Sequence, residues 1–527
     1  MSNILSEYIN VEFSNCWNVS NSIFKLLNDK GEFNPKEFIS SCTFINNTFY
    51  LALAQGSRYI ILSHSQNSSS QDLTLVSMNL DGSREKISSI KCMGIYSSSA
   101  FKKREMDQLL IFVGYETGRL VIFSKEGLSL LSQKLHNTEL FRIQVYFDHK
   151  NYYKQAKKHL KKNSALTLSD NKNLTDVTNI SGFYDINLCF RDGVIIIIDS
   201  QSLWLSLQLS IKNSEMYNLS DSENDLFFSF KKIDLKTSPI QDAVSCGTYS
   251  VMPEQLSSLN DKITSSNLIS QSVTNSFLVV HSKSMIDIFT TTETINYSFS
   301  ALKFANRVAS KVGGAVFSLA KSYLWASHSQ NLSDDVNQQN LRPSSPIIAP
   351  DSISINSSLN INDGNRKIIK IFPAPPHYHM AALLDSFGRI LVLDTITYEI
   401  IMIWKGFREA QCDWIDYSSD ITDLPNSSEN SQNIQNTAQN VLLFLVLYAS
   451  RLGVLQVYSI LMPNKPIATF QIGRGYQLIS SNSHSLGEPL LAELNLSSNK
   501  LISNQGKRSI LMDSNGRIFK LEIKQNL

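Results

Sequence analysis

Few residues in this sequence have the types and spacing that chemistry requires. In His377-Tyr378-His379, both imidazoles would lie on one side of an extended segment and could supply two metal ligands. The preceding Pro373, Pro375 and Pro376 favour instead a turn that enters the next strand. The sequence lacks a phosphate-binding loop ending in Lys-Ser or Lys-Thr, a Gly-x-Ser-x-Gly elbow and a His-Glu-x-x-His pair. We therefore predict no catalytic residues, no metal, no cofactor and a protein that is not an enzyme.

Charged side chains cluster in the segment WKGFREAQ, residues 404–411. Trp404 and Phe407 are suited to burial, whereas Lys405, Arg408 and Glu409 are suited to exposure. Two interpretations follow: the segment is a corner that the fold requires, or its charged residues contact a partner.

A second charged segment, residues 301–327, has apolar residues at three- and four-residue steps, which predicts an amphipathic helix. The pair Gly313-Gly314 would weaken or kink this helix. The residues that would contact a membrane or a partner are Lys303, Arg307, Lys311, Phe317, Lys321 and Trp325. Basic residues with aromatic ones are typical of a helix lying on anionic lipid, and packing on the protein itself or on a partner is the other interpretation.

Composition restricts the class of protein. The formal net charge of +2 gives no overall basic field, so we expect no nucleic-acid partner. The six cysteines are scattered, which indicates buried free thiols in a reducing compartment. The N-terminus carries no secretory signal, and the longest apolar runs are far shorter than a membrane-spanning helix. We expect a cytoplasmic protein.

The elements that must position these residues are strands. Seven segments share one pattern, an apolar run, a short polar turn and a second apolar run, which is typical of a β-hairpin. They are residues 50–64, 109–123, 188–199, 277–289, 381–393, 444–458 and 510–521. Two turns are nearly identical, Asp385-Ser386-Phe387-Gly388 and Asp513-Ser514-Asn515-Gly516, so we predict one turn geometry used repeatedly.

The repeats predict an irregular, WD40-like β-propeller with seven blades, formed by residues 1–527 as a single all-β domain. When the polar stretches are left out, the hairpin glycines recur at about 40 residues, the length of a four-stranded blade. Three Ser- and Asn-rich stretches, residues 329–365, 418–440 and 480–505, are predicted to be low-complexity loops. We expect the last hairpin, residues 508–523, to close the ring by pairing with an N-terminal strand near residues 38–45.

WKGFREAQ, followed by Trp414-Ile415, resembles the signature of the N-terminal domain of the non-catalytic, regulatory subunit of the Rab-3 GTPase-activating protein. Residues 112–133, 383–394 and 444–459 support the resemblance, and the order of elements agrees.

The resemblance implies a propeller that binds a separate catalytic subunit. Such a complex acts on Rab-type small GTPases in vesicle traffic and endoplasmic-reticulum organisation, stimulating GTP hydrolysis on one and nucleotide exchange on another. It further implies a cytoplasmic scaffold, peripheral on endoplasmic-reticulum or vesicle membranes, and no catalytic arginine in this chain. The alternative is a phosphoinositide- or membrane-binding propeller adaptor. The family's long C-terminal region is absent from this sequence, so we expect a compact, divergent member.

Overall fold

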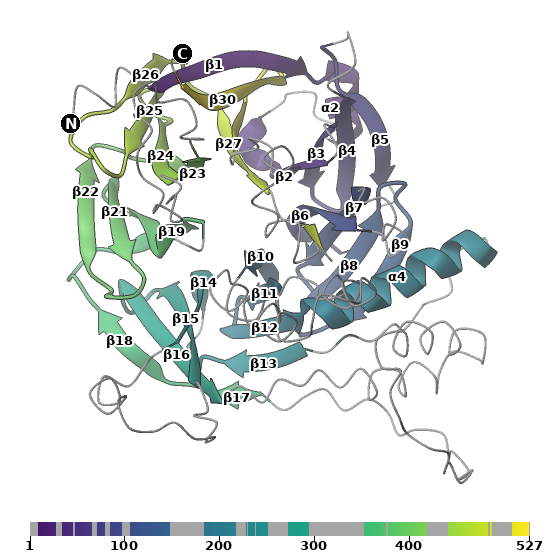
Figure 1. The fold of residues 1–527 in the computed structure, drawn as a ribbon, viewed down its shortest axis with the longest axis horizontal. Helices are drawn as coiled ribbons and strands as arrows, with labels where there is room; N and C mark the ends of the chain where they lie inside the picture. Colours follow the sequence, from purple (N-terminus) through teal and green to yellow (C-terminus); the bar gives the residue numbers. More distant parts are fainter. Residues whose placement is uncertain are drawn as a thin grey trace, which may run out of the picture.

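The computed structural model describes residues 9–27, 34–45, 48–65, 71–79, 85–96, 106–147, 184–217, 228, 230–237, 239–250, 272–294, 352–375, 378–418, 441–482, 485–486 and 508–525. The described strands form six sheets arranged as a ring, with one edge of each sheet near the centre and the other at the perimeter (Figure 1). The protein is therefore an all-β propeller, as the sequence predicts.

Five sheets each contain a four-stranded antiparallel meander and form separate blades. Their strands, from the centre outward, are as follows. The first has β6 (Ile87–Tyr96), β7 (Met106–Tyr115), β8 (Arg119–Ser124) and β9 (Ser129–Lys134), and the second has β10 (Leu140–Phe147), β11 (Tyr184–Phe190), β12 (Val194–Asp199) and β13 (Phe230–Asp234). The third has β14 (Ile240–Ser250), β15 (Ser272–His281), β16 (Ile286–Thr294) and β18 (Ser357–Ile361). The fourth has β19 (Ile368–Pro373), β20 (Met380–Asp385), β21 (Arg389–Asp394) and β22 (Ile400–Lys405), and the fifth has β23 (Ala410–Ser418), β24 (Val441–Ala449), β25 (Val454–Ser459) and β26 (Ala468–Gln471).

The sixth sheet has eight strands and contains both ends of the described chain. Its order is β1 (Ile9–Asn18), β30 (Arg517–Gln525), β29 (Ser509–Met512), β27 (Gln477–Asn482), β2 (Ile39–Ile45), β3 (Thr48–Gln55), β4 (Arg58–Ser65) and β5 (Thr74–Asn79). Its two halves meet where β27 and β2 run parallel, through the pairs Cys42↔Ser481 and Thr43↔Asn482.

The last hairpin pairs with an N-terminal strand, but the strand is not the one that we predicted. β30 pairs with β1 over nine residue pairs from Ile9↔Gln525 to Asn18↔Arg517, whereas residues 39–45 form β2 and pair with β27. The hairpin pattern does not include β1, because its alternation of polar and apolar residues is typical of a strand exposed on one side, not of a buried hairpin.

All seven predicted hairpins are present, and each supplies the two strands that follow the innermost strand of a four-strand run. These middle strands have neighbours on both edges and apolar clusters on both faces. In β21, for example, Ile390 and Val392 pack toward β24, whereas Leu391 and Leu393 pack toward β15 and β16. Burial on both faces explains their uninterrupted apolar sequences.

The two near-identical turns have the same geometry. Asp385 Oδ1 accepts hydrogen bonds from Phe387 N (2.9 Å) and Arg389 N (2.6 Å), and Asp513 Oδ1 accepts equivalent bonds from the backbone N–H groups two and four residues later (both 2.8 Å). Gly388 and Gly516 both have positive φ, 78° and 79°, a conformation that favours glycine.

Two of the predicted loops contain strands. The described part of residues 329–365 includes β17 (Ile353–Ser354) and β18, and residues 480–505 include the end of β27 and β28 (Ser485–Leu486). β18 is exposed along almost all its length at the perimeter, so its Ser and Asn side chains stay hydrated and add little desolvation cost to the strand. β28 was missed because two residues carry no periodicity, although Leu486 is fully buried. Of residues 418–440, only Ser418 is described, and it ends β23.

The described helices are α2 (Asn21–Leu27), the 3-10 turn η1 (Pro35–Glu37) and α4 (Ser200–Tyr217). α4 contacts β9, β11 and β12, and its Leu203 and Leu207 join their apolar cluster. The sequence did not predict α4, because serines at 202, 206 and 210 interrupt its apolar face. The predicted helix at residues 301–327 lies outside the described residues. No helix in the described residues is long and apolar enough to cross a membrane.

The ring closure generates a stability prediction. Trp17 of β1 is buried and stacks on Phe49 of β3 at 4.3 Å between ring centroids. Trp17→Ala should lower the free energy of unfolding by about 3–5 kcal/mol, because it removes a large buried ring that joins the two halves of the sheet. Urea denaturation measures the change. Leu128→Ala, at an exposed position, is the control and should change it by less than about 0.5 kcal/mol. Equal effects of the two substitutions would contradict the role of Trp17.

Candidate functional site

His379, one of the two histidines that could supply metal ligands, lies in the turn that precedes β20, and its carbonyl oxygen accepts a hydrogen bond from Thr395 N (2.8 Å). His377 lies outside the described residues, and Tyr378 N donates to Pro375 O (3.1 Å) in the turn that precedes β20. Across the described residues, no group of three or more His, Cys, Asp or Glu is arranged to hold a metal ion.

One buried cluster brings a serine, a histidine and an aspartate together. His281 Nε2 lies 2.5 Å from Asp287 Oδ2 and 3.0 Å from Ser284 Oγ, while His281 Nδ1 accepts a bond from Lys283 N (3.2 Å). A catalytic triad needs the acid and the hydroxyl on opposite ring nitrogens. Here both contact Nε2, and Asn360 Nδ2 also donates to Asp287 (2.6 Å), so the cluster joins β15, β16 and β18.

The cysteines are all free thiols, and four of the six are buried. Desolvation raises the pKa of Cys92, Cys189 and Cys246 to about 12. Because the thiolate is the reactive form, these side chains remain protonated and poorly nucleophilic near neutral pH.

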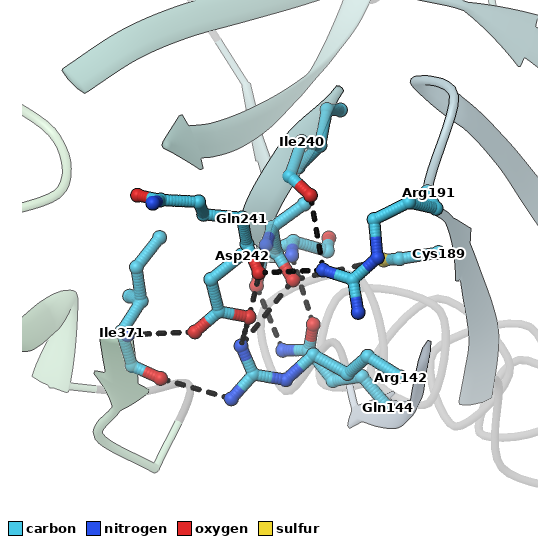
Figure 2. A network of polar contacts seen from close by, with 10 residues as sticks. Arg142, Gln144, Cys189, Arg191, Ile240, Gln241, Asp242 and Ile371 are labelled. Carbon is cyan, nitrogen blue, oxygen red and sulfur yellow. Dashed lines mark hydrogen bonds and ion pairs between the residues drawn. The ribbon is translucent and has the colours of Figure 1, made fainter. Parts of the chain in front are cut away.

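The densest polar network joins the innermost strands of three sheets (Figure 2). Arg142 of β10 donates from Nη1 to Asp242 Oδ1 of β14 (2.5 Å) and from Nη2 to Ile371 O of β19 (2.9 Å). Ile371 N donates in turn to Asp242 Oδ2 (2.7 Å). Gln144 and Ser245 exchange two further bonds, Gln144 Nε2 to Ser245 O (2.9 Å) and Ser245 N to Gln144 Oε1 (2.8 Å).

Arg191 extends this network from the turn between β11 and β12. Its guanidinium donates to both carboxylate oxygens of Glu139 (3.0 Å each) and to the carbonyl oxygens of Ile240 (3.0 Å) and Gln241 (3.2 Å). The hydrogen-bond partners of Arg142 and Arg191 thus lie on or next to neighbouring strands of the propeller, and the network fixes neighbouring sheets against one another.

Similar bonds, each with at least one partner on an innermost strand, join neighbouring sheets elsewhere in the ring. Each links a side chain of one sheet or half-sheet to the next: Ser41 Oγ accepts from Cys92 N (3.0 Å), Ser89 Oγ donates to Leu140 O (2.7 Å), Trp414 Nε1 donates to Phe372 O (2.9 Å), Gln411 Oε1 accepts from Leu478 N (2.6 Å), and Ser509 Oγ donates to Asp413 Oδ2 (2.6 Å). The polar residues of the inner strands are therefore used mainly to hold the ring together.

Lys370 of β19 lies beside this network. Its side chain retains solvent access, but the surrounding strands remove part of its hydration. This desolvation is the main reason that the pKa of its ammonium group is lowered. Repulsion from Arg142 lowers the pKa further, and attraction to Asp242 partly opposes the shift. Its Nζ lies 5.3 Å from the centroid of the Phe372 ring.

The segment WKGFREAQ connects the outermost strand of one sheet, β22, to the innermost strand of the next, β23. Phe407 is buried, and its N–H donates to Gly388 O (2.8 Å). A Cβ on Gly388 would lie 2.5 Å from Arg408 Cγ, so glycine is needed where the connection crosses the turn. Trp404 is half-buried, and its Nε1 donates to Pro463 O (3.0 Å).

The charged residues of this connection are exposed. Lys405 and Arg408 form no ion pair with any residue that the structure describes, whereas Glu409 Oε1 accepts from Arg451 Nε (2.9 Å) and Nη2 (2.8 Å). Glu409 has a positive φ of 55°, and its carbonyl oxygen accepts from Ser450 Oγ (2.8 Å).

Two exposed apolar side chains flank the connection. Phe387 and Leu452 lie in the turns after β20 and β24 and are 51% and 66% exposed. We call Phe387, Lys405, Arg408, Glu409 and Leu452 the connector surface. Its three charged residues could be found from the sequence, but its two apolar residues could not, because they come from separate turns of the chain. The predicted membrane or partner residues Lys303, Arg307, Lys311, Phe317, Lys321 and Trp325 lie outside the described residues.

The inner network generates a second prediction. Asp242→Ala should lower the free energy of unfolding by about 3–5 kcal/mol, because it leaves the partly buried Arg142 guanidinium and Ile371 N–H without their acceptor. Chemical denaturation measures this loss. The double variant Arg142→Met/Asp242→Leu should be more stable than Asp242→Ala, since no uncompensated charge remains. A double variant less stable than the single one would contradict this explanation.

Lys370 generates a pH prediction. A lowered pKa means that the folded protein binds this proton less tightly than the unfolded chain does. The Lys370 contribution to stability should therefore increase as the pH rises through the folded-state pKa toward the ordinary value of 10.5. The free energy of unfolding of the natural protein and of Lys370→Met is measured across this pH range. The difference between the two isolates the Lys370 contribution, because the buried tyrosines and thiols are the same in both proteins. A difference between the two that stays constant with pH would exclude it.

Two solved structures are similar to this chain. Saccharomyces cerevisiae Sqt1 is 10% identical, with a TM-score of 0.37 over 92% of this chain and 84% of Sqt1. BBS1N, solved in complex with ARL6DN, is 7% identical, with a TM-score of 0.41 over 98% of this chain and 96% of BBS1N.

A family profile gives the assignment. The profile of the Rab3 GTPase-activating protein regulatory subunit N-terminus matches residues 40–479, which include the connector surface and strands of all six sheets. Because the match covers most of the chain, this protein belongs to the family of the Rab3 GTPase-activating protein regulatory subunit N-terminus.

Proposed function

We propose that this protein is the non-catalytic scaffold subunit of a complex that regulates Rab-type small GTPases, and that it binds a separate catalytic subunit. The observation that carries the proposal is the family match over residues 40–479. The polar side chains of the inner strands support it, because they bond mainly to neighbouring strands instead of converging on a substrate site.

The connector surface is the partner contact in this proposal. Lys405 and Arg408 are exposed without an acidic partner among the described residues, and Phe387 and Leu452 add exposed apolar area beside them. Apolar groups with charges at their rim are the usual composition of a protein–protein interface. A catalytic subunit with acidic groups around an apolar contact would complement this surface.

The ring is proposed to have seven blades. The eight-stranded sheet consists of two runs of four, β2 to β5 and β27, β29, β30 and β1, and the pairing of β27 with β2 that joins them has two residue pairs. Each run has the strand order of a blade. If each run counts as one blade, these two and the five separate blades make seven, the number that the seven hairpins predict.

The proposed setting is the cytoplasm, at endoplasmic-reticulum or vesicle membranes. The complex would activate GTP hydrolysis by a Rab protein, with nucleotide exchange as its second activity. In this arrangement the catalytic subunit supplies the reacting groups, and the propeller supplies rigid surfaces.

Co-purification tests the proposed function. Tagged natural protein should retrieve the catalytic subunit of a Rab GTPase-activating complex from native extract. Lys405→Glu/Arg408→Glu should reduce recovery by about tenfold, because it reverses two charges at the contact. Lys25→Glu/Lys36→Glu, a double reversal at exposed positions on α2 and η1, is the matched control and should bind normally.

Two outcomes would contradict these proposals separately. Failure of the natural protein to retrieve any catalytic subunit would overturn the scaffold function, and flotation of the protein alone with phosphoinositide vesicles would then favour a membrane adaptor. Normal recovery with the Lys405→Glu/Arg408→Glu variant would exclude the connector surface as the contact.

A further inference from the structure

β22 presents an open edge at the perimeter of the ring. It is the last strand of its sheet and pairs only with β21, so its outward backbone N–H and C=O groups have no strand partner in the described residues (Figure 1). Its sequence, IIMIWK, contains no proline and has its only charge at the last residue. Such an edge is a template for an additional strand.

The chain covers some sheet edges with its own segments, whereas the outer strands β1, β5, β18 and β26, like β22, have no further strand partner in the described residues. β17 pairs in parallel with the outer strand β13, and β28 pairs in parallel with the inner strand β6. α4 contacts the outer strand β9. These sheets therefore accept an added strand or helix at an edge, and β22 has no equivalent cover among the described residues.

β22 also exposes aliphatic side chains. Ile400, Ile401 and Ile403 are 39%, 42% and 53% exposed. Ile403 lies opposite Leu391, and Ile400 lies opposite Leu393, across the strand pair. Because Leu391 and Leu393 belong to the buried cluster against β15 and β16, Ile400 and Ile403 extend that apolar face outward to the perimeter.

One end of this surface has unbalanced positive charge. Arg389 of β21 lies directly opposite Lys405 of β22, and like charges in this position repel. Neither side chain forms an ion pair with a described residue. Arg408, three positions beyond Lys405, also forms no ion pair with a described residue. A carboxylate beside Lys405 would relieve the repulsion.

We propose that β22 binds an extended segment of a protein partner by strand addition, and that this segment carries β-branched residues at alternate positions and an acidic residue at its N-terminal end. The segment runs antiparallel to β22, as β21 does, because antiparallel pairing is the more stable per residue. β22 runs toward Lys405, so the acidic residue that pairs with Lys405 comes first in the segment. The following aliphatic residues then cover Ile403 and Ile400.

This inference goes beyond the proposed function, because it requires neither a Rab protein nor a catalytic subunit. The probe is a fluorescein-labelled, acetylated and amidated peptide with the core Glu-Thr-Val-Thr-Val-Thr. Fluorescence anisotropy with the full chain should show saturable binding. Ile403→Lys should weaken binding by about tenfold, because it removes an aliphatic contact and repels an added strand. Leu128→Lys, at a similarly exposed position in the turn between β8 and β9, should bind normally.

Two further probes distinguish strand addition from adhesion to an apolar surface. Alternate amides of a strand point to opposite edges, so N-methylation of one alternate set should abolish binding and methylation of the other set should not. Lys405→Glu should weaken binding of this peptide, and replacing its Glu by Lys should restore it.

The proposal is overturned if the unmodified peptide shows no saturable binding, or if both methylated peptides bind as well as it does. Concentration-dependent dimerisation that Ile403→Lys removes would identify a second copy of the chain as the occupant of β22, and would also overturn it. Analytical ultracentrifugation of the natural protein and of Ile403→Lys measures that outcome.

Discussion

The antiparallel pairing of β1 with β30 is the contact on which the ring depends. It joins residues near position 10 to residues near position 520, so it closes a loop that contains almost the whole chain. The same closure is reinforced where Val19 N donates to Gly516 O and where β27 pairs with β2. Because closing so long a loop costs conformational entropy, the ring also depends on interactions between neighbouring sheets.

Those interactions are of two kinds, and they have different effects. Apolar clusters between the faces of adjacent sheets supply most of the stabilisation, but they are non-directional. The inner-strand hydrogen bonds are directional: Arg142 reaches both Asp242 and Ile371, so it fixes three sheets at once. Burying such groups costs desolvation, and the bonds offset that cost only in one arrangement of the sheets. The polar residues of the inner strands thus favour the observed arrangement of the sheets.

This division explains how much could be predicted from the sequence. The middle strands are buried on both faces, so their apolar runs predicted all seven hairpins. Inner and outer strands gave weaker patterns: β19 contains Lys370, and β18 is exposed, so its sequence resembles a loop. For the connector surface, Lys405, Arg408 and Glu409 could be predicted to be exposed from their charge. Phe387 and Leu452 could not be assigned to the same surface, because the ring brings their turns together.

In the connection at residues 406–409, the fold uses the backbone and the Phe407 side chain, and the charged side chains remain available for binding. Phe407 N donates to the carbonyl oxygen of a hairpin glycine, Gly388. The same hydrogen bond, from the backbone N–H of a residue that follows an outer strand to a turn glycine, recurs at Gly56, Gly118, Gly193, Gly453 and Gly516. The fold therefore requires a backbone N–H and a turn glycine at each such connection. Neither requirement involves the side chains of Lys405 or Arg408, which remain exposed. These two cations, at the end of an open apolar strand, are therefore available for the partner contact proposed above.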